Sequence, residues 1–178
     1  MFVVTVGLQE ATTVVIGNSV GENNPEQGRR FFKLTALIAL VVSIALAVFL
    51  VDFKETLISL FTKEHDVTEL SIKIMPIVSI KFIFDGMQGY LQGVIRGLGL
   101  QQLGSIIALV VAYVIQIPLS VILAFKLHWG IAGLWWADAF CMMIQGISYF
   151  LLSVVSDWTE ITRGVLRRIQ DEKSEISQ

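Results

Sequence analysis

Charged residues are scarce in this sequence. Only 16% of its 178 residues are Asp, Glu, Lys or Arg, whereas a soluble domain carries about a quarter. The hydrophobic fraction is 54%, and a chain of this size cannot hide so much apolar surface inside one small core. These proportions exclude an ordinary soluble domain and favour a chain for which the lipid bilayer is the solvent.

Cysteine and histidine are nearly absent as well. The single Cys141 excludes an internal disulfide, and its apolar neighbours indicate a buried thiol and not a reactive one. Without a CxxC or HExxH motif we expect no metal site, no organic cofactor and no enzyme. No basic patch is interleaved with aromatic residues, so nucleic acid is not an expected partner.

Long apolar runs are what the sequence has in abundance. The run 104–125 carries no charge, and its 22 residues would reach about 33 Å as a helix, which is enough to cross the hydrocarbon of a bilayer. Two of the other runs are nearly as apolar, and two contain more polar residues. We predict five membrane-spanning helices, at 2–20, 34–51, 74–95, 104–125 and 129–156. The expected fold class is an all-α, polytopic membrane helical bundle.

The predicted membrane region covers 1–156, and a charged tail follows at 157–178. Between the second and third spans, apolar residues near 57–61 predict a short amphipathic helix at the membrane surface. Lys and Arg are unevenly divided between the two sides of the membrane. One side carries Arg29, Arg30, Lys33, Arg96, Arg163, Arg167, Arg168 and Lys173, and the other carries Lys54, Lys63, Lys73 and Lys126. Positive residues favour the cytoplasmic side, so we expect the tail there. Five spans then place Met1 outside, which indicates the rear part of a longer protein.

A polar row lies on one face of the predicted helix at 74–95. Its members are Lys81, Asp85, Gln88 and Gln92. They recur at spacings of four, three and four, and residues so spaced share one helical face. A charge in hydrocarbon costs about 2.5–3.5 kcal/mol even on a mild insertion scale. We therefore expect this face to look at a cavity or at other helices.

A stripe of small residues runs beside the polar row on the same predicted helix. It consists of Gly89, Gly93 and Gly97. Small residues at this spacing let the backbone of a second helix come close. The stripe therefore predicts a tightly packed neighbour on that side of the helix.

Three acids fall inside predicted spans. Asp85 lies about 16 Å along its helix from Ile74, near the middle of the membrane. Glu10 and Asp138 are expected in the outer halves of their helices. Three acids against the single Lys81 leave a negative interior, which suits a cationic guest, a proton or both. A purely structural explanation stays open: Lys81 could pair with Asp85, and the other two acids could join helices by polar contacts.

Four segments resemble the multidrug and toxic compound extrusion (MATE) family of transporters, especially its eukaryotic branch. They are "VGLQEATTVVIGNSVGENNPEQGRR", "FDGMQGYLQGVIRGLGLQQLG", "YVIQIPLSVILAFKLHWGIAGLWWA" and "SDWTEITR". Together they cover nearly the whole chain, in the order and with the loop lengths of the family. The resemblance implies twelve helices in two lobes of six, of which this chain is the second lobe without its opening helix.

The resemblance also implies a function. Such transporters export organic cations and other amphipathic compounds by alternating access, driven by a proton or sodium ion, in the plasma membrane or an organelle membrane. Asp85 falls on the family's acidic position and is expected to couple the ion to the substrate. Helical position, and not the motif, adds Gln88 and Gln92 as expected cavity-lining residues. Lys81, Glu10 and Asp138 are further candidates for the lining.

Some features depart from the family. The first lobe, an expected partner, is missing, and so is the opening helix that carries a second acid. Glu10 stands where relatives usually have a small residue. The alternatives are therefore a non-transporting remnant, a half-transporter subunit, or a flippase for lipid-linked oligosaccharides from the same superfamily. An intramembrane enzyme ranks last, because only Asp138 could serve as a second catalytic group and no motif surrounds it.

Overall fold

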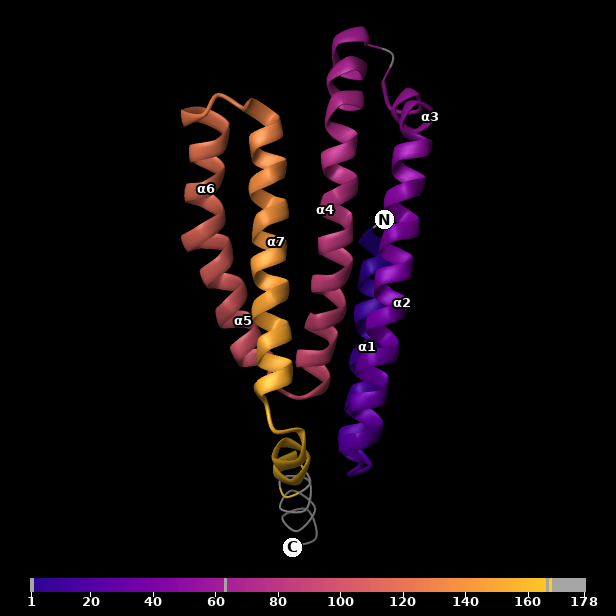
Figure 1. The fold of residues 1–178 in the computed structure, drawn as a ribbon, viewed down its shortest axis with the longest axis vertical. Helices are drawn as coiled ribbons and strands as arrows, with labels where there is room; N and C mark the ends of the chain where they lie inside the picture. The colour runs from indigo at the N-terminus through magenta and orange to yellow at the C-terminus, as the bar shows by residue number, and fades with distance from the viewer. Residues whose placement is uncertain (1, 63, 166, 168–178) are drawn as a thin grey trace, which may run out of the picture.

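The computed structural model describes residues 2–62, 64–165 and 167, and this part of the chain is helical throughout, with no strand (Figure 1). The predicted all-α class is confirmed. The helices are α1 (Phe2–Gly21), α2 (Pro25–Asp52), α3 (Lys54–Ser59), α4 (His65–Gly97), α5 (Gln101–Leu109), η1 (Val110–Gln116), α6 (Ile117–Val121), η2 (Ile122–Lys126) and α7 (Gly130–Val155). The four pieces from α5 to η2 follow one another without a break and form one long helix with two π-helical stretches.

The first two helices are joined by a much shorter turn than the sequence suggests. The predicted connection at 21–33 shrinks to 22–24, because α2 already begins at Pro25. Asn24 caps this helix by accepting a hydrogen bond from the backbone N–H of Gln27 at 3.1 Å, and Pro25 supplies the fixed φ that suits a first helical position. Local capping chemistry therefore lengthens α2 well beyond its apolar run.

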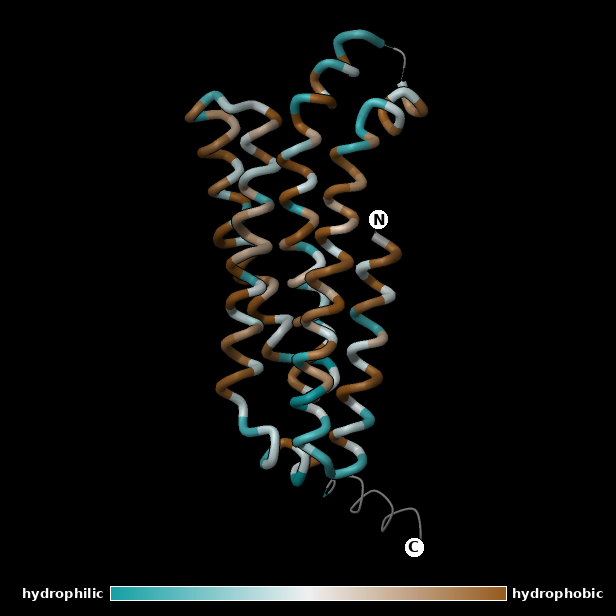
Figure 2. Tube along the Cα trace, turned by 45° about the vertical axis from the view of Figure 1, so that its right-hand side comes forward, coloured by the Kyte–Doolittle hydropathy of each residue, from teal (hydrophilic) through white to brown (hydrophobic). Residues whose placement is uncertain are grey.

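Within the described residues, three helices are long and apolar enough to cross a membrane: Pro25–Asp52, Gln101–Lys126 and Gly130–Val155. They contain the predicted spans 34–51 and 104–125 and nearly all of 129–156. The predicted spans in α1 and α4 carry more polar residues and stay predictions. Figure 2 shows hydrophobic residues dominating the middle of the bundle and hydrophilic ones gathering at its two ends.

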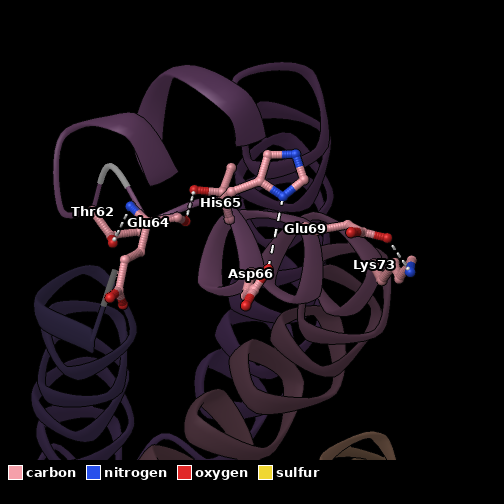
Figure 3. Close-up of polar contacts among 7 residues, drawn as sticks. Thr62, Glu64, His65, Asp66, Glu69 and Lys73 are labelled. Carbon is pink, nitrogen blue, oxygen red and sulfur yellow. Dashed lines mark hydrogen bonds and ion pairs between the residues drawn. The ribbon is translucent and has the colours of Figure 1, made fainter.

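Helix α4 is the centre of the bundle and packs against α1, α2 and α7. Its 33 residues reach about 50 Å, so it rises beyond its neighbours in Figure 1. The short α3 lies between the second and third spans and overlaps the region predicted as helical, but it ends before Leu60 and Phe61, and its place at the membrane surface stays a prediction. Figure 3 shows the start of α4, where the backbone N–H of Glu64 donates to Thr62 Oγ1 before the helix begins and Lys73 pairs with Glu69 at 2.6 Å within it.

The glycine stripe of α4 receives α1, as predicted. A Cβ added to Gly93 would lie 2.5 Å from the backbone oxygen of Gln9, and one added to Gly97 would lie 2.7 Å from Ile16 Cβ. Both separations are shorter than real side chains tolerate. Gly86 extends the stripe toward α2, where Ser43 fills the space that a Cβ would need. Backbone-to-side-chain packing therefore locks α1 and α2 onto α4.

The chain after α7 folds back onto the start of α2. Residues 158–165 are helical, and Trp158 is only 3% exposed because its ring packs against Phe32 and over Gly28. Its indole N–H donates to the backbone oxygen of Ser153 at 2.8 Å. The beginning of the predicted tail is therefore an anchored helix, while residues 168–178 lie outside the described part.

Candidate functional site

The polar row of α4 lies between the sides of the helix that contact α1 and α7. On one side the glycine stripe meets α1. On the other, Gln88 approaches α7, where a Cβ added to Gly146 would lie 4.0 Å from Gln88 Cβ. The row therefore lies between α1 on one side of α4 and α7 on the other.

Lys81 forms its ion pair with α7 and not with an acid of its own helix. Its Nζ lies 3.1 Å from Asp138 Oδ2, and the two side chains are 17% and 21% exposed. The second oxygen, Oδ1, accepts a hydrogen bond from Gln116 Nε2 at 2.9 Å. One carboxylate thus joins α4, η1 and α7. The alternative of a structural Lys81–Asp85 pair is wrong, because Lys81 reaches across to a neighbouring helix.

Asp85 lies one helical turn below this junction and is half-buried. Within the described part of the chain it makes no ion pair and no side-chain hydrogen bond. The charges of Lys81 and Asp138 are close enough to act on it, with opposite signs. Asp85 is therefore the carboxylate of the row that is left open to a further partner.

Lower on the row, two amides lead into a pocket. Gln88 is buried and donates to Gln92 Oε1 across a long contact of 3.5 Å. A pocket of about 480 Å³ follows at the lower end of α4. It is lined by Gln92, Ile95, Arg96, Gln101, Gly104, Ser105 and Tyr149. Gln92 therefore faces a cavity, whereas Gln88 is enclosed between α4 and α7.

Glu10 lies lower in the bundle than its position in the sequence suggests. It pairs with Arg96 Nη1 at 3.0 Å, in the last turn of α4, and both side chains are about half exposed. Glu10 lies in the N-terminal half of α1, the expected half of its own helix, but α1 as a whole lies low in the bundle. Helix α1 begins about halfway up the bundle and runs beside the lower half of α4, parallel to it (Figure 1).

Asp138 lies nearer to the Gly130 end of α7 than to its other end, on the side where Trp129 begins the helix. That position agrees with its expected place. The three acids of the interior are therefore spread along the bundle: Asp138 in the upper part, Asp85 below it, and Glu10 near the base.

Sequence reasoning missed two polar residues of this region. Gln116 is the one amide in the apolar run 104–125, and that isolation was the available signal. Tyr149 is 1% exposed and donates its hydroxyl to the backbone oxygen of Gly104 at 3.0 Å. A tyrosine in an apolar helix gives little warning of such a role, because it also fits an ordinary core position. No three His, Cys, Asp or Glu side chains cluster as metal ligands within the described ranges.

The long apolar helices and the ionised side chains between them define a multi-pass α-helical membrane protein with a polar interior. The profile of the MatE family matches residues 1–122. The chain therefore belongs to the MatE family, and the resemblance seen in its motifs is confirmed.

Individual relatives agree. The chain is 29% identical over 160 residues to multidrug and toxin extrusion protein 2 of Mus musculus, covering 90% of this chain and 28% of the relative. It is 27% identical over 169 residues to protein DETOXIFICATION 41 of Arabidopsis thaliana, covering 95% of this chain and 33% of that protein.

A solved structure shares the fold. The crystal structure of a eukaryotic MATE transporter superimposes with a TM-score of 0.88 at 27% identity, covering 93% of this chain and 37% of the other. The chain thus spans about a third of the length of the relatives that it matches.

Proposed function

We propose that the chain acts in membrane transport, as part of an antiporter that exports amphipathic or cationic compounds by alternating access. Asp85 is the carboxylate that exchanges the coupling ion, a proton or a sodium ion, for the cationic guest. The remaining partners are the lipid bilayer and the lobe that the relatives possess and this chain does not span. We propose no enzymatic role, and either the plasma membrane or an organelle membrane is compatible with this function.

One observation carries the proposal. Of the three acids in the predicted spans, Asp138 and Glu10 are each paired with a basic side chain, at 3.1 Å and 3.0 Å. Asp85 has no such partner within the described residues. An unneutralised carboxylate near the middle of a membrane is costly unless a mobile cation or proton occupies it. Asp85 therefore has the property that a coupling group needs.

The names of the relatives supply the substrate class. The proteins of Mus musculus and Oryctolagus cuniculus are multidrug and toxin extrusion proteins, and the superimposed crystal structure is that of a eukaryotic MATE transporter. Gln88 and Gln92 follow Asp85 on the same row, and Gln92 opens into the pocket. Neutral amides suit a path for an amphipathic compound, because they offer hydrogen bonds without holding a fixed charge.

The alternatives make different demands. A flippase for a phosphorylated lipid needs an excess of positive charge, but Lys81 and Arg96 are both occupied by carboxylates. A remnant without function would have no reason to keep two ion pairs and a free acid in its interior. A half-transporter subunit would use the same Asp85, so it differs in assembly and not in chemistry.

The test is efflux of ethidium from proteoliposomes containing the full chain and driven by an imposed proton or sodium gradient. Asp85→Asn is expected to abolish gradient-driven efflux, because the amide keeps the shape but cannot exchange a cation. Asp66→Asn, in the exposed turn of Figure 3, is the matched control and should transport like the parent. Equal efflux in the Asp85→Asn protein would contradict the proposal.

A further inference from the structure

Lys81 is the one basic side chain within the middle of the described bundle, and two carboxylates compete for it. Asp138 holds it now, at 3.1 Å. Asp85 lies four residues further along α4, on the same face and one turn away. Residues at this spacing come within about 5–6 Å of each other at Cβ. A lysine stem is long and flexible enough to serve either partner.

The ion pair between Lys81 and Asp138 has several neighbouring contacts but stays partly exposed. Gln116 orients the Asp138 carboxylate from η1, and the Lys81 ammonium also lies 5.9 Å from the ring of Trp135 and 5.7 Å from that of Phe82. Both partners nevertheless keep about a fifth of their side-chain surface exposed. The ammonium is therefore held at the edge of the packed region, from which it can leave without unpacking the helices.

Helix geometry explains why Asp138 is the resting partner. Long side chains on a helix lean toward its N-terminus, so Lys81 leans away from Asp85 and toward the upper part of α7. An i,i+4 ion pair on a helix is also weaker when the base precedes the acid, as Lys81 precedes Asp85, than when the acid comes first. The pair within α4 is therefore available but less favourable than the pair across to α7.

We propose that Lys81 is an exchangeable internal cation that moves between Asp138 and Asp85 and competes with the transported cation for Asp85. This inference rests on the proposed function of Asp85. While Asp138 holds Lys81, Asp85 is open to a guest. When the ammonium moves to Asp85, it displaces the guest, and Asp138 keeps only the Gln116 amide. Lys81 is thus a positioning residue that sets how tightly Asp85 retains its cation.

The test measures binding of tetraphenylphosphonium to the full chain in lipid nanodiscs. Asp138→Asn removes the resting partner, so Lys81 settles on Asp85 and affinity falls by about tenfold or more. The double variant Lys81→Met with Asp138→Asn removes the competitor too, and binding returns to the parental level or above it. Glu69→Gln with Lys73→Met deletes an exposed ion pair near the start of α4, away from the row and the pocket, as a control and leaves the affinity unchanged.

The outcomes distinguish the exchange of Lys81 from the proposed role of Asp85. If Asp85→Asn binds the probe as well as the parent does, the proposed role of Asp85 fails. If Asp85→Asn loses binding while Asp138→Asn keeps it, the role of Asp85 stands and the exchange of Lys81 is overturned. A double variant that binds as weakly as Asp138→Asn also overturns it, because a purely structural role of the pair predicts that result.

A second measurement needs no variant that could fail to fold. Solid-state NMR on the parent protein, with labelled lysine and aspartate, reports whether Lys81 Nζ lies near the carboxyl carbon of Asp85 or of Asp138. Without tetraphenylphosphonium we expect contacts to both, and with saturating probe only the contact to Asp138. Contact to Asp138 alone under both conditions would overturn the proposal.

Discussion

The two sides of α4 are built in different ways. Toward α1 and α2, glycines bring backbone and small side chains into contact, and Gly93 lies against the Gln9 backbone with no room for a methyl group. Toward α7, the contacts include the Lys81–Asp138 ion pair, and Met87 and Phe150 line a pocket of about 270 Å³ between the two helices. The first side is joined through backbone and small side chains, whereas the second is joined through long polar side chains. The proposed exchange of Lys81 therefore falls at the junction of α4 with α7, and the glycine stripe is the tightly packed side.

Breaking the ion pair on the α7 side should have the largest effect on stability. Lys81→Met leaves the Asp138 carboxylate inside the bundle without its counter-charge, and such a loss costs about 3–5 kcal/mol in buried settings. The double change of Lys81→Met and Asp138→Asn should be milder than Lys81→Met alone, since no charge is left behind. Unfolding midpoints in detergent, followed by circular dichroism, measure both. A double variant less stable than either single variant would count against the pair.

Adding a methyl group to the glycine stripe that contacts α1 should have the second-largest effect on stability. Gly93→Ala places a methyl group against the Gln9 backbone oxygen, which cannot move aside as a flexible side chain could. Overpacking of this kind costs about 1–3 kcal/mol. Gly146→Ala on α7 is the matched control, because its new methyl group meets Gln88 Cβ at an ordinary contact distance of 4.0 Å. The same melting experiment compares the two, and equal midpoints would remove the claimed asymmetry.

The second ion pair should matter much less than the first. Glu10 and Arg96 keep 55% and 44% of their side chains exposed, so solvent screens their attraction. Glu10→Gln should therefore cost at most about 1 kcal/mol. The shift of the unfolding midpoint should be well below that of Lys81→Met. A shift as large as that of Lys81→Met would contradict the claim that the more exposed ion pair contributes less to stability.

The smallest effect concerns Asp157, at the start of the predicted tail and after the end of α7. The backbone N–H groups of Thr159 and Glu160 donate to the Asp157 carboxylate, and these bonds hold its pKa below the usual range. A lowered folded pKa means that the contribution to stability is present at neutral pH. It is lost as the pH falls below about 4 toward the folded pKa. Amide hydrogen exchange at Thr159 should therefore speed up in acid, and Asp157→Asn should remove that acceleration. An unchanged acid response in the variant would contradict this cause.

Much of α4 could be predicted because its pattern is local. The polar row and the glycine stripe follow from helical spacing alone, and the structure confirms that Gly93 and Gly97 receive another helix. The partner of Lys81 could not be predicted, since it depends on which residues of α7 come level with α4.

The partner of Glu10, Arg96, could not be predicted for a related reason. The spacing of residues within α1 does not reveal how far that helix is shifted along α4, and this shift follows from which side chain meets each glycine. Gln116 shows the same limit: its isolation in an apolar run was visible, but its partner on α7 was not. Which residues share a helical face can be predicted from their spacing in the sequence. Contacts between helices also depend on how the helices are placed relative to one another.

The central claim is that Asp85 is the acid whose cation is exchanged. The most direct measurement is the release of protons or sodium ions when tetraphenylphosphonium binds to the full chain in nanodiscs, recorded with a pH-sensitive dye and a sodium electrode. If Asp85 exchanges the cation, the parent protein and Asp66→Asn release one of the two ions. Asp85→Asn then releases neither. Undiminished release by Asp85→Asn would contradict the account, because the exchanging acid would then lie elsewhere.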